Sequence, residues 1–114
     1  MQDVKAADGT RIYAQDWGHG PAIVLVHGWP LDADMWEYQA VPLAEAGFRV
    51  ITYDRRGFGR SDQPRSGYDY DTLSDDLKSV MDAMEVKDAT LVGFSMGGGE
   101  AARYMARHGG AGVS

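Results

Sequence analysis

One short stretch, Gly93-Phe94-Ser95-Met96-Gly97, constrains the fold of this chain more than any other. An apolar segment, residues 89–94, precedes the turn, and a segment with helical character follows to about His108. A strand, a sharp turn that carries a serine and then a helix form the context of the Gly-x-Ser-x-Gly motif called a nucleophile elbow. A Cβ atom at Gly93 or Gly97 would collide where the helix start meets the strand end. We therefore expect Ser95 in a strained conformation, with its Oγ at the C-terminal edge of a sheet.

Length and composition limit the remaining possibilities. A chain of 114 residues forms one domain at most. Its content of 44% hydrophobic and 25% charged residues is ordinary for a globular protein. The net charge of −6 argues against nucleic-acid binding. The absence of cysteine excludes disulfides and thiolate metal sites and fits a reducing compartment, so we expect a cytoplasmic protein. The longest apolar run, residues 22–26, is too short to span a membrane, and the start of the chain lacks an apolar core of signal-peptide length.

Strand and helix patterns alternate along the chain. Residues 4–6 and 11–17 flank Asp8-Gly9 and predict a hairpin at a sheet edge. Further strands are predicted at 22–26, 49–53 and 89–94, and helices from Asp32 or Asp34 to Gly47, from 71 to 85, and after Ser95. We expect a kink or break at Pro42. The pattern predicts an α/β fold with about five strands, three helices and a mostly parallel sheet, and a flexible tail after residue 108.

Three loops are predicted to meet beyond the C-terminal ends of the parallel strands, where such sheets bind ligands. They are residues 27–30, residues 54–62 and the turn at Ser95. Together these motifs, in this order and spacing, resemble the α/β-hydrolase family, and most of all its branch of cofactor-free haloperoxidases, perhydrolases and aryl esterases. The resemblance covers about residues 4–110 and implies the N-terminal portion of that fold, with strand 50–53 on the opposite side of strand 23–26 from strand 90–94.

The resemblance implies a role for several residues. Ser95 corresponds to the nucleophile, and the backbone N–H groups of Trp29 and Met96 correspond to the oxyanion hole. In this branch, water or hydrogen peroxide attacks the acyl-serine, which gives ester hydrolysis or a peracid that oxidises halides. The implied substrate is a small ester or a carboxylic acid with peroxide, and no cofactor or metal is expected. A serine at this position argues against the dehalogenase and epoxide-hydrolase branches, which need a carboxylate nucleophile.

The sequence departs from the family where the triad acid and base are concerned. After Ser95 the acidic residue is Glu100 and the histidine is His108, and both belong to the predicted elbow helix. His108 lies 13 residues from Ser95, about 20 Å along that helix, and cannot accept a proton from Ser95 in the same chain. We therefore expect residues 1–114 to form a single truncated core domain without a cap. By family the protein is an enzyme, but this chain alone is expected to be inactive.

Simpler, structural roles are expected for other residues near the predicted site. His27 is expected to fix its loop by hydrogen bonding, Gly28 to be structural near the site, and Asp54, Arg55 and Arg56 to form an internal ion-pair and turn network. Other side chains are expected to pack or to lie on the surface. Residues 98, 101, 102 and 105 are expected to face the sheet. Core or pocket positions are expected for Met81, Met84, Met96 and Met105, helix packing for Trp36 and Tyr38, and surface positions for His19 and His108.

Two alternatives to the N-terminal part of a single-chain hydrolase remain open. The chain could be a catalytically inert half-domain that associates with itself, or one part of a split hydrolase completed by another chain. In all three cases we expect strand 90–94 to have an unpaired apolar edge, with residues 102, 104 and 105 exposed beside it. We therefore predict a homodimer or larger homo-oligomer formed through that edge.

Overall fold

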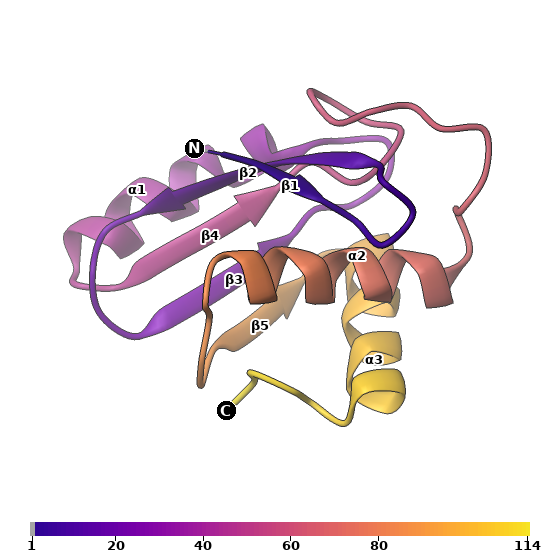
Figure 1. The fold of residues 1–114 in the computed structure, drawn as a ribbon. Coiled ribbons are helices and arrows are strands. Elements are labelled where there is room, and N and C mark those ends of the chain that lie inside the picture. The colour runs from indigo at the N-terminus through magenta and orange to yellow at the C-terminus, as the bar shows by residue number, and fades with distance from the viewer. Residues whose placement is uncertain (1) are drawn as a thin grey trace.

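A computed structural model describes residues 2–114 and has five strands and three α-helices (Figure 1). The strands are β1 (Gln2–Lys5), β2 (Arg11–Trp17), β3 (Ala22–Val26), β4 (Arg49–Tyr53) and β5 (Thr90–Gly93). The helices are α1 (Glu37–Glu45), α2 (Tyr70–Ala83) and α3 (Met96–His108), and the 3₁₀ helix η1 (Ala33–Trp36) precedes α1. None of these helices, within the described part of the chain, has the length and hydropathy that crossing a membrane requires.

The five strands form one mixed sheet in the order β1-β2-β4-β3-β5. The strand β3 is parallel to both neighbours, with Val24 opposite Ile51 of β4 and Leu91 of β5. The pairs β1–β2 and β2–β4 are antiparallel, so the first two strands form the predicted hairpin at a sheet edge. The predicted fold class and the predicted order of the three parallel strands are confirmed.

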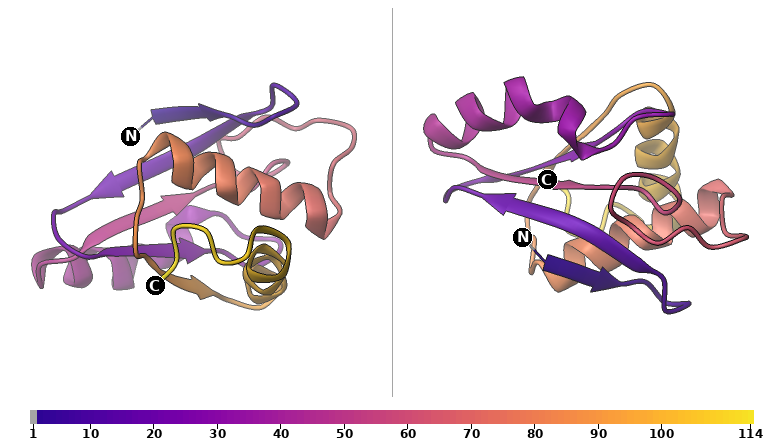
Figure 2. Two further views of the ribbon diagram at one scale, coloured as in Figure 1. Left: turned by 60° about the horizontal axis from the view of Figure 1, so that its bottom comes forward. Right: turned by 90° about the horizontal axis from the view of Figure 1, so that it is seen from above.

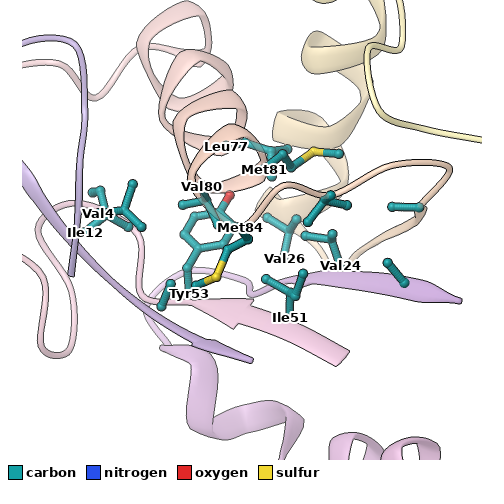
Figure 3. Close-up of a cluster of buried hydrophobic side chains, with 14 of the residues drawn as sticks. Val4, Ile12, Val24, Val26, Ile51, Tyr53, Leu77, Val80, Met81 and Met84 are labelled. Carbon is teal, nitrogen blue, oxygen red and sulfur yellow. The ribbon is translucent and has the colours of Figure 1, made fainter. Parts of the chain in front are cut away.

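The sheet is covered on both faces, with α1 on one side and α2 and α3 on the other (Figure 2). The strand β3 alternates accordingly, because Val24 and Val26 pack under α2 whereas Leu25 packs under α1. The larger core lies between α2 and the sheet (Figure 3), and α2 contributes its predicted apolar face there: Leu77, Val80, Met81 and, just beyond the helix, Met84. Trp36 is buried in the smaller core, as expected.

The helix predicted to begin at Asp32 or Asp34 differs from expectation at its proline. Asp32 caps η1 by accepting from the Asp34 N–H, and the change from 3₁₀ to α geometry falls at Glu37. The break expected at Pro42 is wrong, because α1 continues through it to Glu45. A proline here removes the donor for the Tyr38 carbonyl. Tyr38 is 85% exposed, so water can replace that donor, and the expected packing of its side chain is also wrong.

The inward face of α3 was predicted only in part. Gly97, Glu100 and Tyr104 are buried, whereas Ala102 and Met105 are exposed. The reason is the close approach of the helix start to β3, which brings Gly97 against the backbone of residues 26 and 27 and thereby sets which side of the helix faces inward. The expected exposure of Tyr104 is therefore wrong, whereas Ala102 and Met105 line a hollow beside Leu91 of β5.

The tail after α3 is held by backbone pairing, which corrects the expectation of a flexible tail after residue 108. The Ala89 N–H donates to the Gly112 carbonyl at 2.8 Å, and the Ser114 N–H donates to the Ala89 carbonyl at 2.9 Å. Val113 thereby forms an isolated parallel bridge with Ala89. Beyond that bridge, β5 pairs only with β3 within residues 2–114, and Phe94 at its end is 52% exposed.

Candidate active site

The turn between β5 and α3 holds Ser95 in a conformation that few non-glycine residues adopt. Its φ is +55° and its ψ is −117°. Hydrogen bonds on both sides hold the turn: the Phe94 N–H donates to the Val26 carbonyl at 3.1 Å, and the Gly97 N–H donates to the Phe94 carbonyl at 2.8 Å. Strain of this kind persists only where the surrounding structure over-determines the backbone, and it concentrates at functional sites.

Three glycines allow the close contacts that the turn requires. A Cβ atom on Gly93 would lie 2.7 Å from the Gly98 nitrogen, and one on Gly97 would lie 2.8 Å from the His27 carbonyl oxygen. A Cβ atom on Gly28 would lie 2.9 Å from Cδ2 of Phe94. Separations below 3.0 Å force atoms to shift, so the geometry at Gly93 and Gly97 agrees with their expected steric role, and the same constraint applies at Gly28.

The loop after β3 lies directly against the Ser95 turn. A Cβ atom built on Gly28 would lie only 3.3 Å from Cβ of Ser95. Within residues 2–114, the backbone N–H groups of Trp29 and Met96 donate to no protein acceptor. The side chain of Trp29 is 64% exposed beside them. Two free backbone donors next to a serine can stabilise a negative oxygen.

The first residue of this loop, His27, is fully buried, and both of its ring nitrogens form hydrogen bonds. Its Nδ1 donates to the Gly28 carbonyl at 2.9 Å, and its Nε2 accepts from the Arg55 N–H at 2.9 Å. This pairing defines the neutral tautomer with the proton on Nδ1. Burial lowers the pKa of His27, which agrees with a neutral ring. The geometry matches the expected loop-fixing role.

Asp54, at the end of β4, organises the second loop. Its Oδ1 accepts from the Ala33 N–H at 2.8 Å, and its Oδ2 accepts from the backbone N–H and Nε of Arg60, each at 2.8 Å. Burial by itself would raise the pKa of Asp54, but the hydrogen bonds from Arg60 and Ala33 outweigh burial and lower it. The carboxylate is therefore a structural anion that joins η1 to the loop after β4.

Two adjacent buried arginines pair with residues other than Asp54, so the single network of Asp54, Arg55 and Arg56 expected from the sequence is instead three separate sets of ion pairs. Arg56 donates through Nε to Asp76 of α2 at 2.6 Å and through Nη1 to Asp8 at 2.9 Å. Arg55 donates through Nε to Oε1 of Glu100 at 2.8 Å. Burial lowers the pKa of Arg55 to about 10 and raises that of Glu100, whereas their contact favours the charged form of each. The partner Glu100 was not foreseen.

The other two histidines lie away from Ser95. His108 is partly buried, and its Nε2 lies 2.8 Å from Oδ1 of Asp75, so it joins α3 to α2 and is not the free surface residue expected. His19 is exposed in the loop between β2 and β3, as expected. Glu100 is already engaged by Arg55 and by the hydroxyl of Tyr53. Each histidine of the described residues that is buried or partly buried, and Glu100 with them, is therefore already engaged by a partner other than Ser95.

A serine at a strained strand-to-helix turn, with the loop after the neighbouring parallel strand β3 packed against it, is the arrangement of the elbow of an α/β-hydrolase fold. The family model for the alpha/beta hydrolase fold matches residues 21–113. The chain belongs to the α/β-hydrolase family.

Individual relatives agree with this assignment. The chain is 49% identical over 109 residues to a non-heme haloperoxidase from Rhodococcus erythropolis, an alignment that covers 96% of this chain and 40% of the relative. Among solved structures, an esterase from Exiguobacterium antarcticum matches with a TM-score of 0.97 and 46% identity over 99% of this chain and 42% of its own. A bromoperoxidase from Bacillus anthracis matches with a TM-score of 0.92 and 50% identity, again over 99% and 42%. The chain thus spans well under half the length of these relatives.

Proposed function

We propose that this chain carries the nucleophile and the oxyanion hole of a serine hydrolase similar to cofactor-free haloperoxidases and esterases. The observation that carries the proposal is the conformation of Ser95, with φ of +55° at the turn from β5 into α3. In this role the Oγ of Ser95 attacks the carbonyl carbon of an ester or carboxylic acid. The N–H groups of Trp29 and Met96 then stabilise the negative oxygen that forms. Collapse of this intermediate expels the alcohol of an ester, or water from a carboxylic acid, and leaves the acyl-serine. The proton of the Ser95 hydroxyl passes through the base to the leaving group.

The second half of the proposed reaction releases the acyl group. Attack of water on the acyl-serine gives a carboxylic acid, and attack of hydrogen peroxide gives a peracid; either restores the Ser95 hydroxyl. The peracid would oxidise halides in solution without a metal or cofactor. The similarity to an esterase and to a bromoperoxidase supports both outcomes.

Residues 1–114 alone should nevertheless turn over substrate at close to the background rate. Both ring nitrogens of His27 are engaged, and His108 pairs with Asp75. A serine without its base keeps the oxyanion hole but loses proton transfer, which lowers the rate by factors on the order of 10⁴ to 10⁶. The acid and base would have to come from sequence or chains beyond these residues.

The test is hydrolysis of p-nitrophenyl acetate with and without imidazole, which serves as an external base. Wild type and Ser95→Ala should both be near background without imidazole. With imidazole, wild type should exceed Ser95→Ala after subtraction of hydrolysis by imidazole itself, and Ser66→Ala, at an exposed serine, should match wild type. Equal rates for wild type and Ser95→Ala under all conditions would reject the nucleophile.

Two other outcomes would favour the alternative functions. An unreactive Ser95 in a folded oligomer favours an inert half-domain that associates through β5. Robust turnover without imidazole, lost in Ser95→Ala, contradicts the predicted inactivity and favours an assembly in which another chain supplies the base.

A further inference from the structure

The side chain of Arg55 connects two parts of the candidate site that are distant in sequence. It is buried, and its Nη2 donates to the His27 carbonyl at 2.6 Å. Its backbone N–H donates to the ring of the same histidine at 2.9 Å. Arg55 therefore holds both the main chain and the side chain of His27.

Glu100 fixes the other end of this connection to the elbow helix. It lies in the second turn of α3, is fully buried and accepts from Nε of Arg55 at 2.8 Å through Oε1. Its other oxygen accepts from the hydroxyl of Tyr53 at the end of β4. Both oxygens of Glu100 and two of the three guanidinium nitrogens of Arg55 are hydrogen-bonded, and Nη1 is buried without a partner. These contacts hold both side chains in one arrangement.

The connection ends at the candidate oxyanion hole. The His27 carbonyl stands two residues before the Trp29 N–H, and Glu100 stands four residues after the Met96 N–H. We propose that Arg55 and Glu100 are positioning residues that set the distance between the Trp29 and Met96 N–H groups on the two sides of Ser95. The role assigned to these N–H groups rests on the proposed function, whereas the positioning itself concerns geometry alone.

The shape of the arginine side chain is essential to this role. A guanidinium presents several donors in a rigid planar fork, so it can hold Glu100 and the His27 carbonyl at the same time. A lysine keeps the positive charge that Glu100 requires but is a single point donor on a flexible stem. If Arg55 served only to neutralise Glu100, Arg55→Lys would be tolerated without movement of the loop.

The experiment compares backbone amide NMR spectra of wild type, Arg55→Lys and Arg56→Lys. Arg56 is the matched control because it is the adjacent residue, is also buried, and contacts Asp8, Ser66 and Asp76 but neither His27 nor α3. We expect Arg55→Lys to shift the amide signals of Gly28, Trp29 and Met96. Arg56→Lys should shift those of Asp8 and Asp76 and leave the first three unchanged.

Two results would overturn the proposal. One is a folded Arg55→Lys protein whose Gly28, Trp29 and Met96 signals coincide with wild type. The other is an Arg56→Lys protein in which they move as far as in Arg55→Lys. If Arg55→Lys does not fold, Glu100→Gln decides by the same signals, because it removes the charge at nearly constant volume. Failure of the serine chemistry is detected separately, by the imidazole-dependent assay, and would not alter these shifts.

Discussion

The backbone N–H of Arg55 donates to Nε2 of His27 at 2.9 Å, which commits the ring to its neutral form inside the fold. Protonation of Nε2 would turn this acceptor into a donor and break the contact. Because burial lowers the pKa of His27 below its usual 6.5, the unfolded chain binds this proton more readily than the folded one. The contribution of His27 to stability is therefore present above about pH 6.5 and is lost as the pH falls below it.

Urea unfolding between about pH 7.5 and pH 5 tests this dependence. The free energy of unfolding of wild type should decrease below pH 6.5. His27→Gln should remove much of that decrease, because glutamine can accept a hydrogen bond but does not titrate. His19→Gln, at an exposed histidine, should keep the wild-type slope. An unchanged slope in His27→Gln would contradict the prediction.

Alanine at Gly97 should destabilise the fold, whereas alanine at the adjacent Gly98 should not. A Cβ atom on Gly97 would lie 2.8 Å from the His27 carbonyl oxygen, but one on Gly98 meets nothing nearer than 3.8 Å. We expect Gly97→Ala to cost about 1–3 kcal/mol through overpacking. Gly98→Ala should gain about 0.5–1 kcal/mol from its higher helix propensity. Denaturant midpoints measure both, and equal effects would argue against the close packing of α3 on β3.

Asp54→Asn should destabilise the protein more than Asp34→Asn does, although both aspartates pair with Arg60. Asp54 is fully buried and also holds the Ala33 N–H, whereas Asp34 is exposed. Hydrogen bonds to a charged group contribute about 1.5–3 kcal/mol, and exposed ion pairs about 0–1 kcal/mol. Thermal unfolding at pH 7 should give similar midpoint temperatures for wild type and Asp34→Asn, and a lower midpoint temperature for Asp54→Asn. A reversed order would reject the assigned anchor.

The open edge of β5 should lead to self-association. Val92 of β5 and Phe94, just after the strand, are exposed, and an unpaired strand edge of this kind favours pairing with a second copy. We propose a homodimer in which the two β5 strands pair antiparallel about a two-fold axis. Light scattering after size-exclusion chromatography should give a dimeric mass for wild type and a monomeric mass for Val92→Lys. The control Val41→Lys, at an exposed position on α1, should remain dimeric. A monomeric wild type would contradict the proposal.

Much of the fold was predictable because local patterns and chain order agree. The continuous apolar run 22–26 indicates a strand buried on both faces, and it lies between two parallel neighbours with α1 on one face and α2 on the other. The Gly-x-Ser-x-Gly spacing likewise predicts the strained turn, because the steric requirement of the turn is local.

What could not be predicted depends on contacts between distant residues. The pairing of Arg55 with Glu100 is invisible to periodicity, although a lone carboxylate among the small residues of the α3 start was a usable signal. Two residues of the inward face of α3, Glu100 and Tyr104, were missed because only small and apolar residues were assigned to that face. Contact between Gly97 and the end of β3 instead turns Glu100 and Tyr104 inward.

The parallel arrangement of β4, β3 and β5 also determines when the site can form during folding. His27 and Arg55 are 28 residues apart, and Arg55 and Glu100 are 45 apart, because each parallel connection passes through a helix. Closing such loops costs chain entropy before any contact compensates for it. Substitutions at these three residues should therefore accelerate unfolding much more than they slow refolding. During synthesis, a chain that has not yet produced α3 contains every strand of the sheet but no site.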